Sequence, residues 1–206
     1  MKNISPGYYR SIITVLLLIV FISIYSFVRQ NISFNESARM IDKYYNDATE
    51  AYEQGNYDRS KAQISNVIAS MKVIEYEMDS LSHLQIDHSI GELELLQKTM
   101  NKDIIWDDVV SIIFSRSLNS LTFGEIKLAQ KEFSENNIEK GISFLNSAKA
   151  HLLTSLVYLR PTKQSPNQAM IGQISTLLNS IEHSESYSEK LQLLSKDSRK
   201  LLIAVN

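Results

Sequence analysis

The stretch Ile138-Glu-Lys-Gly-Ile-Ser-Phe-Leu-Asn-Ser-Ala-Lys-Ala-His-Leu-Leu-Thr-Ser-Leu-Val-Tyr-Leu159 decides the fold class of this chain. Its apolar residues return every three or four positions, at Ile138, Ile142, Leu145, Ala148, Leu152, Leu156 and Leu159. This period is typical of an amphipathic helix that buries one face. Asn136 and Asn137 predict a tight turn before the helix, and Pro161 predicts its end.

The residues before this helix show the same punctuation. A second apolar stripe predicts a helix that ends near Leu81, and its members are Ile64, Val67, Ile68, Met71, Ile74 and Met78. We expect Gly55 to end the preceding helix in a left-handed conformation and Asn56 to cap the next one. Capping boxes predict further helix starts at residues 33–36, 89–92, 122–125 and 165–168. With only 6 Gly and 3 Pro, the chain is predicted to be all-α, an antiparallel array or bundle of about six to eight helices.

The run Ser11–Val28 contains no charged residue, no Pro and no Gly. As a helix it is about 27 Å long, close to the thickness of the hydrocarbon core of a bilayer. A cleaved secretory signal is the alternative. Bulky Tyr25 and Phe27 stand where a cleavage site needs small residues, so we predict an uncleaved single transmembrane helix that binds the lipid bilayer.

This membrane run sets the domain organisation. The predicted parts are a tail at 1–10, the anchor at 11–28 and a helical domain at 29–206 with halves at 34–120 and 121–206. Lys2 and Arg10 precede the run, and no acidic residue accompanies them. The basic flank and the short tail predict a cytoplasmic N-terminus, so the single-pass protein places its main domain outside the cytoplasm.

Composition excludes several classes of function. The formal net charge is -2, which gives no electrostatic footprint for nucleic acid. The chain has no cysteine, so it has neither disulfides nor thiolate metal sites. The nucleophile motif Gly-x-Ser-x-Gly and a Gly-rich phosphate loop are both absent. We therefore expect neither an enzyme nor a cofactor.

A metal site is also not expected. His88 and Glu92 are four residues apart near a predicted helix start, so both could reach one ion, but no third ligand is visible. The acids Asp103, Asp107 and Asp108 favour the start of a helix through its dipole. We interpret all of them as structural or exposed residues.

Four tyrosines gather around the first predicted turn, namely Tyr44, Tyr45, Tyr52 and Tyr57. Core packing is the default role for half of them. Tyr45 and Tyr52 are seven residues apart, which places them on the same face of a helix. These two are the candidate protein-binding residues.

Two turn regions of the chain repeat each other. Ala48, Tyr52, Gly55, Asn56 and Ser60 match Ala129, Phe133, Asn136, Asn137 and Gly141. Each copy resembles the turn region of a tetratricopeptide-type helical hairpin, in which a small residue lets the second helix approach closely. The Trp-Leu-Gly start and the terminal Pro of that family are missing, and any tight antiparallel helix pair selects similar residues. The resemblance implies a protein-binding helical scaffold and no chemistry.

These features together predict a membrane-anchored scaffold or protein-interaction module that docks other proteins through helix faces. The alternative is a ligand-sensing helical ectodomain that signals through a partner protein, because a tail of about ten residues is too short to fold into an output domain. A wide exposed groove of aromatic and aliphatic residues favours docking, whereas a large apolar pocket with converging polar groups favours sensing.

Overall fold

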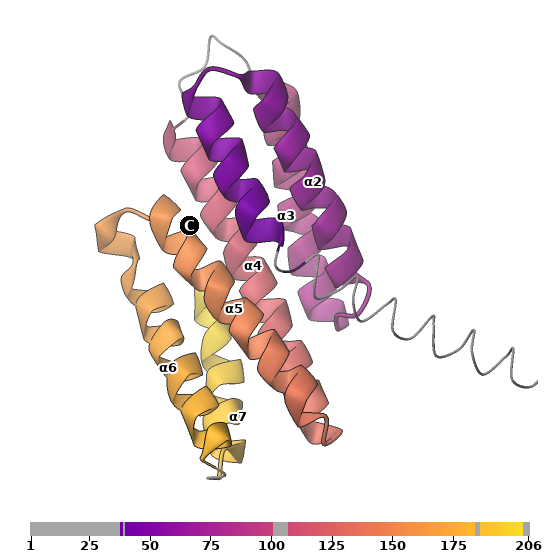
Figure 1. The fold of residues 1–206 in the computed structure, drawn as a ribbon, viewed down its shortest axis with the longest axis vertical. Helices are drawn as coiled ribbons and strands as arrows, with labels where there is room; N and C mark the ends of the chain where they lie inside the picture. The colour runs from indigo at the N-terminus through magenta and orange to yellow at the C-terminus, as the bar shows by residue number, and fades with distance from the viewer. Residues whose placement is uncertain (1–37, 39, 101–106, 184–185, 204–206) are drawn as a thin grey trace, which may run out of the picture. The chain divides into compact units, whose positions relative to one another are not determined.

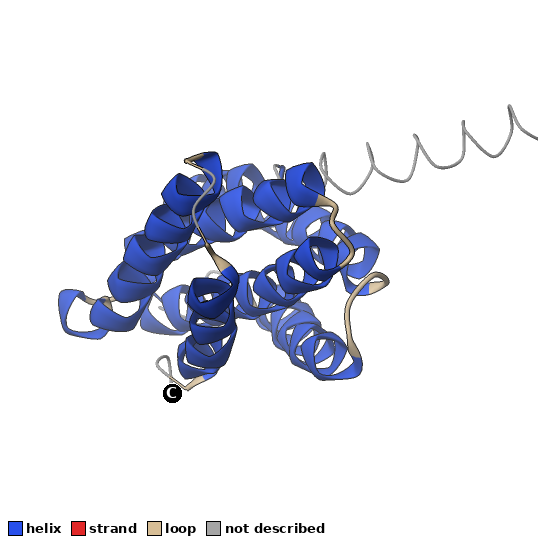
Figure 2. Ribbon diagram, turned by 90° about the horizontal axis from the view of Figure 1, so that it is seen from below, coloured by secondary structure: helices blue, strands red, loops and turns tan. Residues whose placement is uncertain are grey.

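The computed structural model describes residue 38 and residues 40–100, 107–183 and 186–203. Among these residues every regular element is a helix, as Figures 1 and 2 show. A first helix covers residues 40–53. It is followed by α2 (Tyr57–Glu75), α3 (Ser80–Thr99), α4 (Asp107–Ser134), α5 (Ile138–Tyr158), η1 (Pro161–Lys163), α6 (Ser165–Glu182), α7 (Ser188–Asp197) and η2 (Ser198–Leu202). The predicted all-α bundle is confirmed.

The predicted membrane anchor lies outside the part of the chain that the structure describes. None of the helices that the structure describes is both long and apolar enough to cross a bilayer. The tail at 1–10, the run at 11–28 and the box at 33–36 all fall outside the described residues. The anchor therefore stays a prediction.

Both predicted turns are confirmed. Gly55 has a φ of 71° and Asn136 a φ of 63°, so each residue adopts the left-handed conformation that ends a helix. Asn56 caps α2, because its side-chain oxygen accepts a hydrogen bond from the backbone N–H of Arg59 at 3.1 Å. Asn137 precedes α5 without such a bond.

The small residues after the turns lie at helix contacts. The Ser60 hydroxyl donates to the carbonyl oxygen of Ala48 at 2.8 Å, which ties α2 to the first helix. A Cβ on Gly141 would stand 2.8 Å from Cζ of Phe133. The predicted close approach of α4 and α5 at Gly141 is therefore confirmed.

One predicted helix end and two predicted helix starts are wrong. The helix after Asn56 ends at Glu75 rather than near Leu81, and Asp79 starts α3 by accepting a hydrogen bond from Ser82 N at 2.8 Å. Ser89 and Thr122 lie inside α3 and α4. The Ser89 hydroxyl donates to the Ser120 hydroxyl at 2.9 Å, and the Thr122 hydroxyl donates to the carbonyl of Leu118 at 2.9 Å. Both side chains therefore bond inside the bundle and cap no helix start.

The suggested division between 120 and 121 is also wrong, because it falls inside α4. All described residues belong to one compact unit, Ser37–Asn206. Helix α4 contacts α3, α5, α7 and η2 and forms the centre of this unit. Its fully buried apolar residues include Phe114, Leu118, Leu121, Phe123 and Ile126.

Candidate functional site

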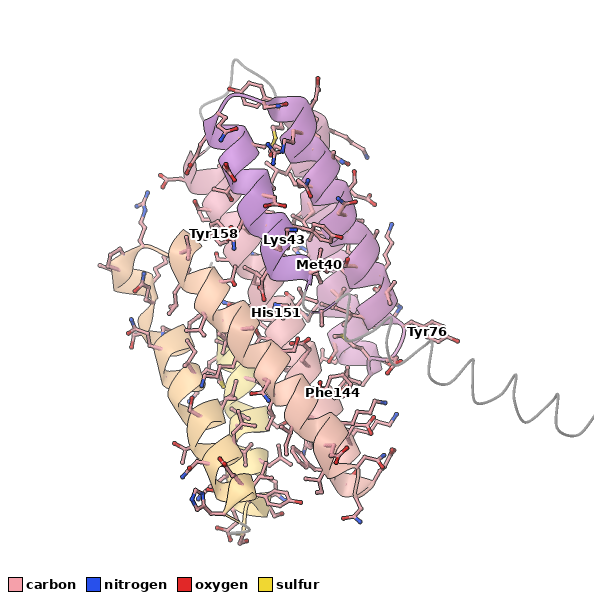
Figure 3. All side chains as sticks on the ribbon, viewed as in Figure 1. Met40, Lys43, Tyr76, Phe144, His151 and Tyr158 are labelled. Atoms are coloured by element: carbon pink, nitrogen blue, oxygen red, sulfur yellow. The ribbon has the colours of Figure 1, made fainter. Side chains whose placement is uncertain are left out.

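The first helix meets α4 and α5 through hydrogen-bonding side chains. Asp42 and Thr49 are each three or four residues from Tyr45 and from Asn46, so the four side chains lie on one broad face of the helix. We call this face, together with its partners His151, Ser117 and Tyr158, the polar seam. Figure 3 labels His151 and Tyr158 of α5 beside Met40 and Lys43 of the first helix, whereas Phe144 lies lower in the view, further along α5.

His151 forms the centre of the polar seam. Its Nδ1 lies 2.9 Å from Oδ1 of Asp42, and its Nε2 lies 3.4 Å from Oε1 of Glu125 in α4. The side chains of His151 and Glu125 are fully buried. The Ser147 hydroxyl donates to the same Glu125 oxygen at 2.6 Å. One ring therefore bridges carboxyl groups from two other helices.

The electrostatics of this site favour a charged histidine. Burial disfavours the imidazolium, but the neighbouring Glu125 and Asp42 carboxyl groups outweigh it and raise the pKa of His151 to about 10. At neutral pH both ring nitrogens then carry protons. Nδ1 is hydrogen-bonded to Asp42, whereas Nε2 makes no hydrogen bond and pairs with Glu125 by charge alone, at 3.4 Å. The result is a buried ionic bridge that joins the first helix to α4 and α5.

Two tyrosines continue the polar seam. The Tyr45 hydroxyl is hydrogen-bonded to Ser117, and burial raises the pKa of this phenol. Tyr158 accepts a hydrogen bond from Thr49 at 3.2 Å and donates to Asn46 at 3.3 Å. Burial raises the pKa of Tyr158 to about 12. Both phenols are therefore neutral donors.

Tyr45 corrects one prediction. It is fully buried, and its ring packs edge-on against Phe114 at a centroid distance of 4.8 Å. It therefore belongs to the core and forms no binding face with Tyr52. Tyr52 is part-exposed and packs against Tyr57 at 5.7 Å, and its role as a binding residue stays a prediction.

The seam is arranged to fix helices rather than to hold an ion. Each nitrogen of His151 faces a different carboxyl group, so the three side chains do not converge on one point. No group of three or more His, Asp or Glu residues among the described residues could hold a metal. His88 Nδ1 lies 3.9 Å from Glu92 on the surface, and exposed Asp108 pairs with Arg160.

A second candidate site lies on the outer face of α3. Its residues are spaced three and four apart, and we call them the α3 stripe: Leu81, Leu84, His88, Gly91 and Leu95. Leu84 and Leu95 are each 62% exposed and Leu81 is 41% exposed. A Cβ on Gly91 would meet no atom within 4 Å. The stripe is thus an open apolar surface of the kind that forms the seam of a coiled coil.

The sequence analysis predicted neither the polar seam nor the α3 stripe. His151, Glu125 and Asp42 are far apart in the chain, and only the position of His151 between Ala148 and Leu152, on a buried stripe, signals it. The sequence analysis missed the α3 stripe because it placed the helix start at residues 89–92 rather than at Ser80. Once a helix begins at Ser80, the spacing of its leucines is plain.

No protein-family model, no curated protein and no solved structure matches this chain. The resemblance of the two turn regions to tetratricopeptide hairpins therefore rests on their residues alone and stays a prediction.

Proposed function

We propose that the protein is a membrane-anchored helical interaction module that binds a protein partner through the α3 stripe and catalyses no reaction. Residues 11–28 hold it in the membrane, with the N-terminus in the cytoplasm and the helical unit outside. The observation that carries the proposal is the α3 stripe itself. It combines exposed leucines with an unobstructed glycine on one face of a helix.

Physical arguments favour a helical partner for this face. Burying a leucine side chain contributes about 1.5–3 kcal/mol, and Leu84 and Leu95 both stand mostly in water. The opposite face of α3 is already used, because Ile86, Ile90 and Leu93 are buried in the core. An apolar repeat of three and four residues fits the side chains of a second helix packed alongside. Gly91 lets that second backbone approach closely.

Affinity capture with the full chain tests the proposal. The tagged protein is extracted in mild detergent, and the proteins retained by the natural chain are compared with those retained by the variant Leu84→Glu/Leu95→Glu. The matched control is Leu193→Glu in α7, a leucine that is 54% exposed. We expect the stripe variant alone to lose its partners. Equal capture by all three proteins, or release of the natural chain from membranes by alkaline carbonate, would contradict the proposal.

A second candidate function is supported by the polar seam. A ligand-sensing ectodomain needs a joint that can open, and the first helix, which follows the anchor in the chain, is held by an ionic bridge. Hydrogen exchange on the full chain with Asp42→Asn separates the two functions. Sensing predicts faster exchange in residues 40–53 alone, whereas a rigid scaffold predicts that α4 and α5 loosen together with the first helix.

A further inference from the structure

The outer face of α2 is apolar where the helix ends. Ala69, Val73 and Tyr76 are spaced four and three residues apart, so they share this face, and all three are exposed. Tyr76 stands directly after the helix, and its exposure of 87% is the highest of any large hydrophobic side chain that the structure describes. Figure 3 shows it projecting away from the bundle. We call these three residues the turn patch.

The turn patch lies at the end of the bundle where the first helix begins. The first helix and α2 run antiparallel, and the Ser60 hydroxyl bonds the carbonyl of Ala48 between them. Eight residues from this contact in each helix, Met40 stands level with Ile68. Tyr76 is eight residues further along α2. It therefore lies about 12 Å beyond Met40, past the N-terminal end of the first helix.

The length of the linker from the predicted anchor says which surface this end of the bundle meets. Residues 29–37 separate the anchor from Ala38, the first described residue. A linker of this length spans at most about 32 Å when it is fully extended. The opposite turn of the first hairpin, at Gly55, is about 22 Å further from the linker than Met40 is. The linker thus favours the end that carries the turn patch as the one that faces the bilayer.

The charges beside the turn patch do not oppose contact with lipid. The Glu77 carboxyl lies 3.9 Å from the ammonium of Lys140, and the Asp79 carboxyl accepts a hydrogen bond from the backbone of α3. Each acid thus has a partner of its own. Tyrosine is enriched at the boundary between water and lipid, because its ring is apolar and its hydroxyl reaches the headgroups.

The neighbouring turn between α4 and α5 has a different surface. Lys140 connects it to the turn patch through Glu77, so the two turns lie at the same end of the bundle. Its exposed residues Glu135, Asn136 and Asn137 are all polar. Of these two turns, only the one after α2 therefore offers apolar side chains to a bilayer.

We propose that the turn patch rests in the headgroup layer of the bilayer that holds the anchor, with Tyr76 as its deepest residue. The inference rests on the proposed function, because a patch this small binds lipid only when the anchor raises its effective concentration at the membrane. Helix α3 begins at Ser80, just after Tyr76. The Leu81 end of the α3 stripe then starts at the membrane surface, and a partner of the stripe is met beside the bilayer.

The absence of cysteine makes a direct test available, because a single introduced thiol is the only one in the chain. Full chains with Tyr76→Cys, Val73→Cys or Ala62→Cys are labelled with the fluorophore bimane. Each is reconstituted at no more than one chain per vesicle, in phosphatidylcholine that carries a nitroxide near the start of its acyl chains. Quenching then reports contact with lipid in the absence of any other protein or second copy.

Ala62 is the matched control, because it is exposed on the same face of α2, about 21 Å from Tyr76 along the helix. We expect quenching at residue 76 to be at least threefold stronger than at residue 62, with residue 73 between them. Equal quenching at residues 76 and 62, whether weak or strong, would overturn the proposal.

A second variant tests the tyrosine itself. Tyr76→Ser in the Val73→Cys chain should lower quenching at residue 73 at least twofold, because the side chain that enters the headgroup layer is gone. Leu193→Ser in the same chain is the control, since Leu193 is exposed on α7 outside the turn patch. Unchanged quenching after Tyr76→Ser would also overturn the proposal.

The two proposals fail in different ways. A chain that alkaline carbonate releases from membranes contradicts the proposed function. A chain that stays in the membrane and captures a partner through the α3 stripe, but shows equal quenching at residues 76 and 62, supports the interaction module and overturns the lipid contact of the turn patch.

Discussion

The chain contains two similar hairpins. The first is formed by the first helix and α2, and the second by α4 and α5. Their turns have the same backbone geometry, but different side chains hold their helices together. The backbone N–H of Asn56 bonds the carbonyl of Ala51 at 2.8 Å, and that of Asn137 bonds the carbonyl of Glu132 at 2.8 Å. Ser60 N bonds Asn56 O at 3.0 Å, and Gly141 N bonds Asn137 O at 3.0 Å. The two turns therefore match bond for bond.

Side chains make the difference. In the first hairpin the Ser60 hydroxyl bonds the facing backbone, and Asn56 caps its own helix. In the second hairpin Asn137 donates to Glu132, which also pairs with Lys140 at 2.9 Å. There the phenyl ring of Phe133 covers Gly141. Backbone bonds of the same pattern therefore fix both turns, whereas the contact between the two helices of each hairpin depends on its own side chains, Ser60 in the first and Phe133 in the second.

The largest expected effect comes from breaking the ionic bridge that joins the two hairpins. His151→Leu leaves the carboxyl groups of Asp42 and Glu125 without their cation, and an uncompensated buried charge costs about 3–5 kcal/mol. Urea unfolding of the full chain in mild detergent, followed by circular dichroism, measures the loss. His183→Leu, at an exposed histidine, should change stability by less than about 0.5 kcal/mol. A loss below about 1 kcal/mol for His151→Leu would show that the bridge does not hold the hairpins together.

The same bridge predicts a dependence on pH. The pKa of His151 is raised to about 10 in the folded chain from 6.5. Its contribution is therefore complete below pH 6.5 and is lost as the pH rises toward 10. The slope in this window is up to about 1.4 kcal/mol per pH unit.

Urea melts between pH 6.5 and 9 check this slope, with His151→Leu as the control that lacks it. A natural chain that is as stable at pH 9 as at pH 6.5 would contradict the charged bridge.

Next in size is the contact that distinguishes the second hairpin. Gly141→Leu drives a side chain into the ring of Phe133 and should cost about 1–3 kcal/mol through overpacking. Gly172→Leu, at an open helical glycine, should instead stabilise by up to about 1 kcal/mol. Unfolding midpoints of the two variants should therefore move in opposite directions. A stabilised Gly141→Leu would remove the close-packed hairpin and the main support for a repeat-like scaffold.

The smallest effect concerns the turns themselves. Gly55→Val forces a β-branched residue into a positive φ and should cost about 1–2 kcal/mol. Asn136→Gly, at the matching position of the other turn, keeps that conformation and should change stability by less than about 0.5 kcal/mol. Thermal melts compare the pair. Equal losses would show that the two turns are not equivalent.

Particular residues show how much of the fold could be predicted from the sequence. Gly55, Asn56 and Asn136 act on neighbours within five positions, so their turns could be predicted. The boxes at 89–92 and 122–125 misled because Ser and Thr can also bond inside a helix.

Longer-range features could not be predicted in the same way. The His151 bridge depends on Asp42, 109 residues away, and no local signal gives that pairing.

The α3 stripe, by contrast, is a local feature. It could have been predicted if the helix start had been placed at Asp79.

Thiol labelling in intact cells tests the central claim, which is that a membrane protein presents the α3 stripe to a protein partner outside the cytoplasm. A maleimide that cannot cross membranes is added to cells that express the full chain with Leu95→Cys or Leu193→Cys, residues that are 62% and 54% exposed in the structure. The account predicts rapid labelling of Leu193→Cys. It also predicts labelling of Leu95→Cys at least tenfold slower until detergent disperses the membrane. Equal rates at the two positions would contradict docking at α3, and labelling of neither before lysis would contradict the placement of the domain outside the cytoplasm.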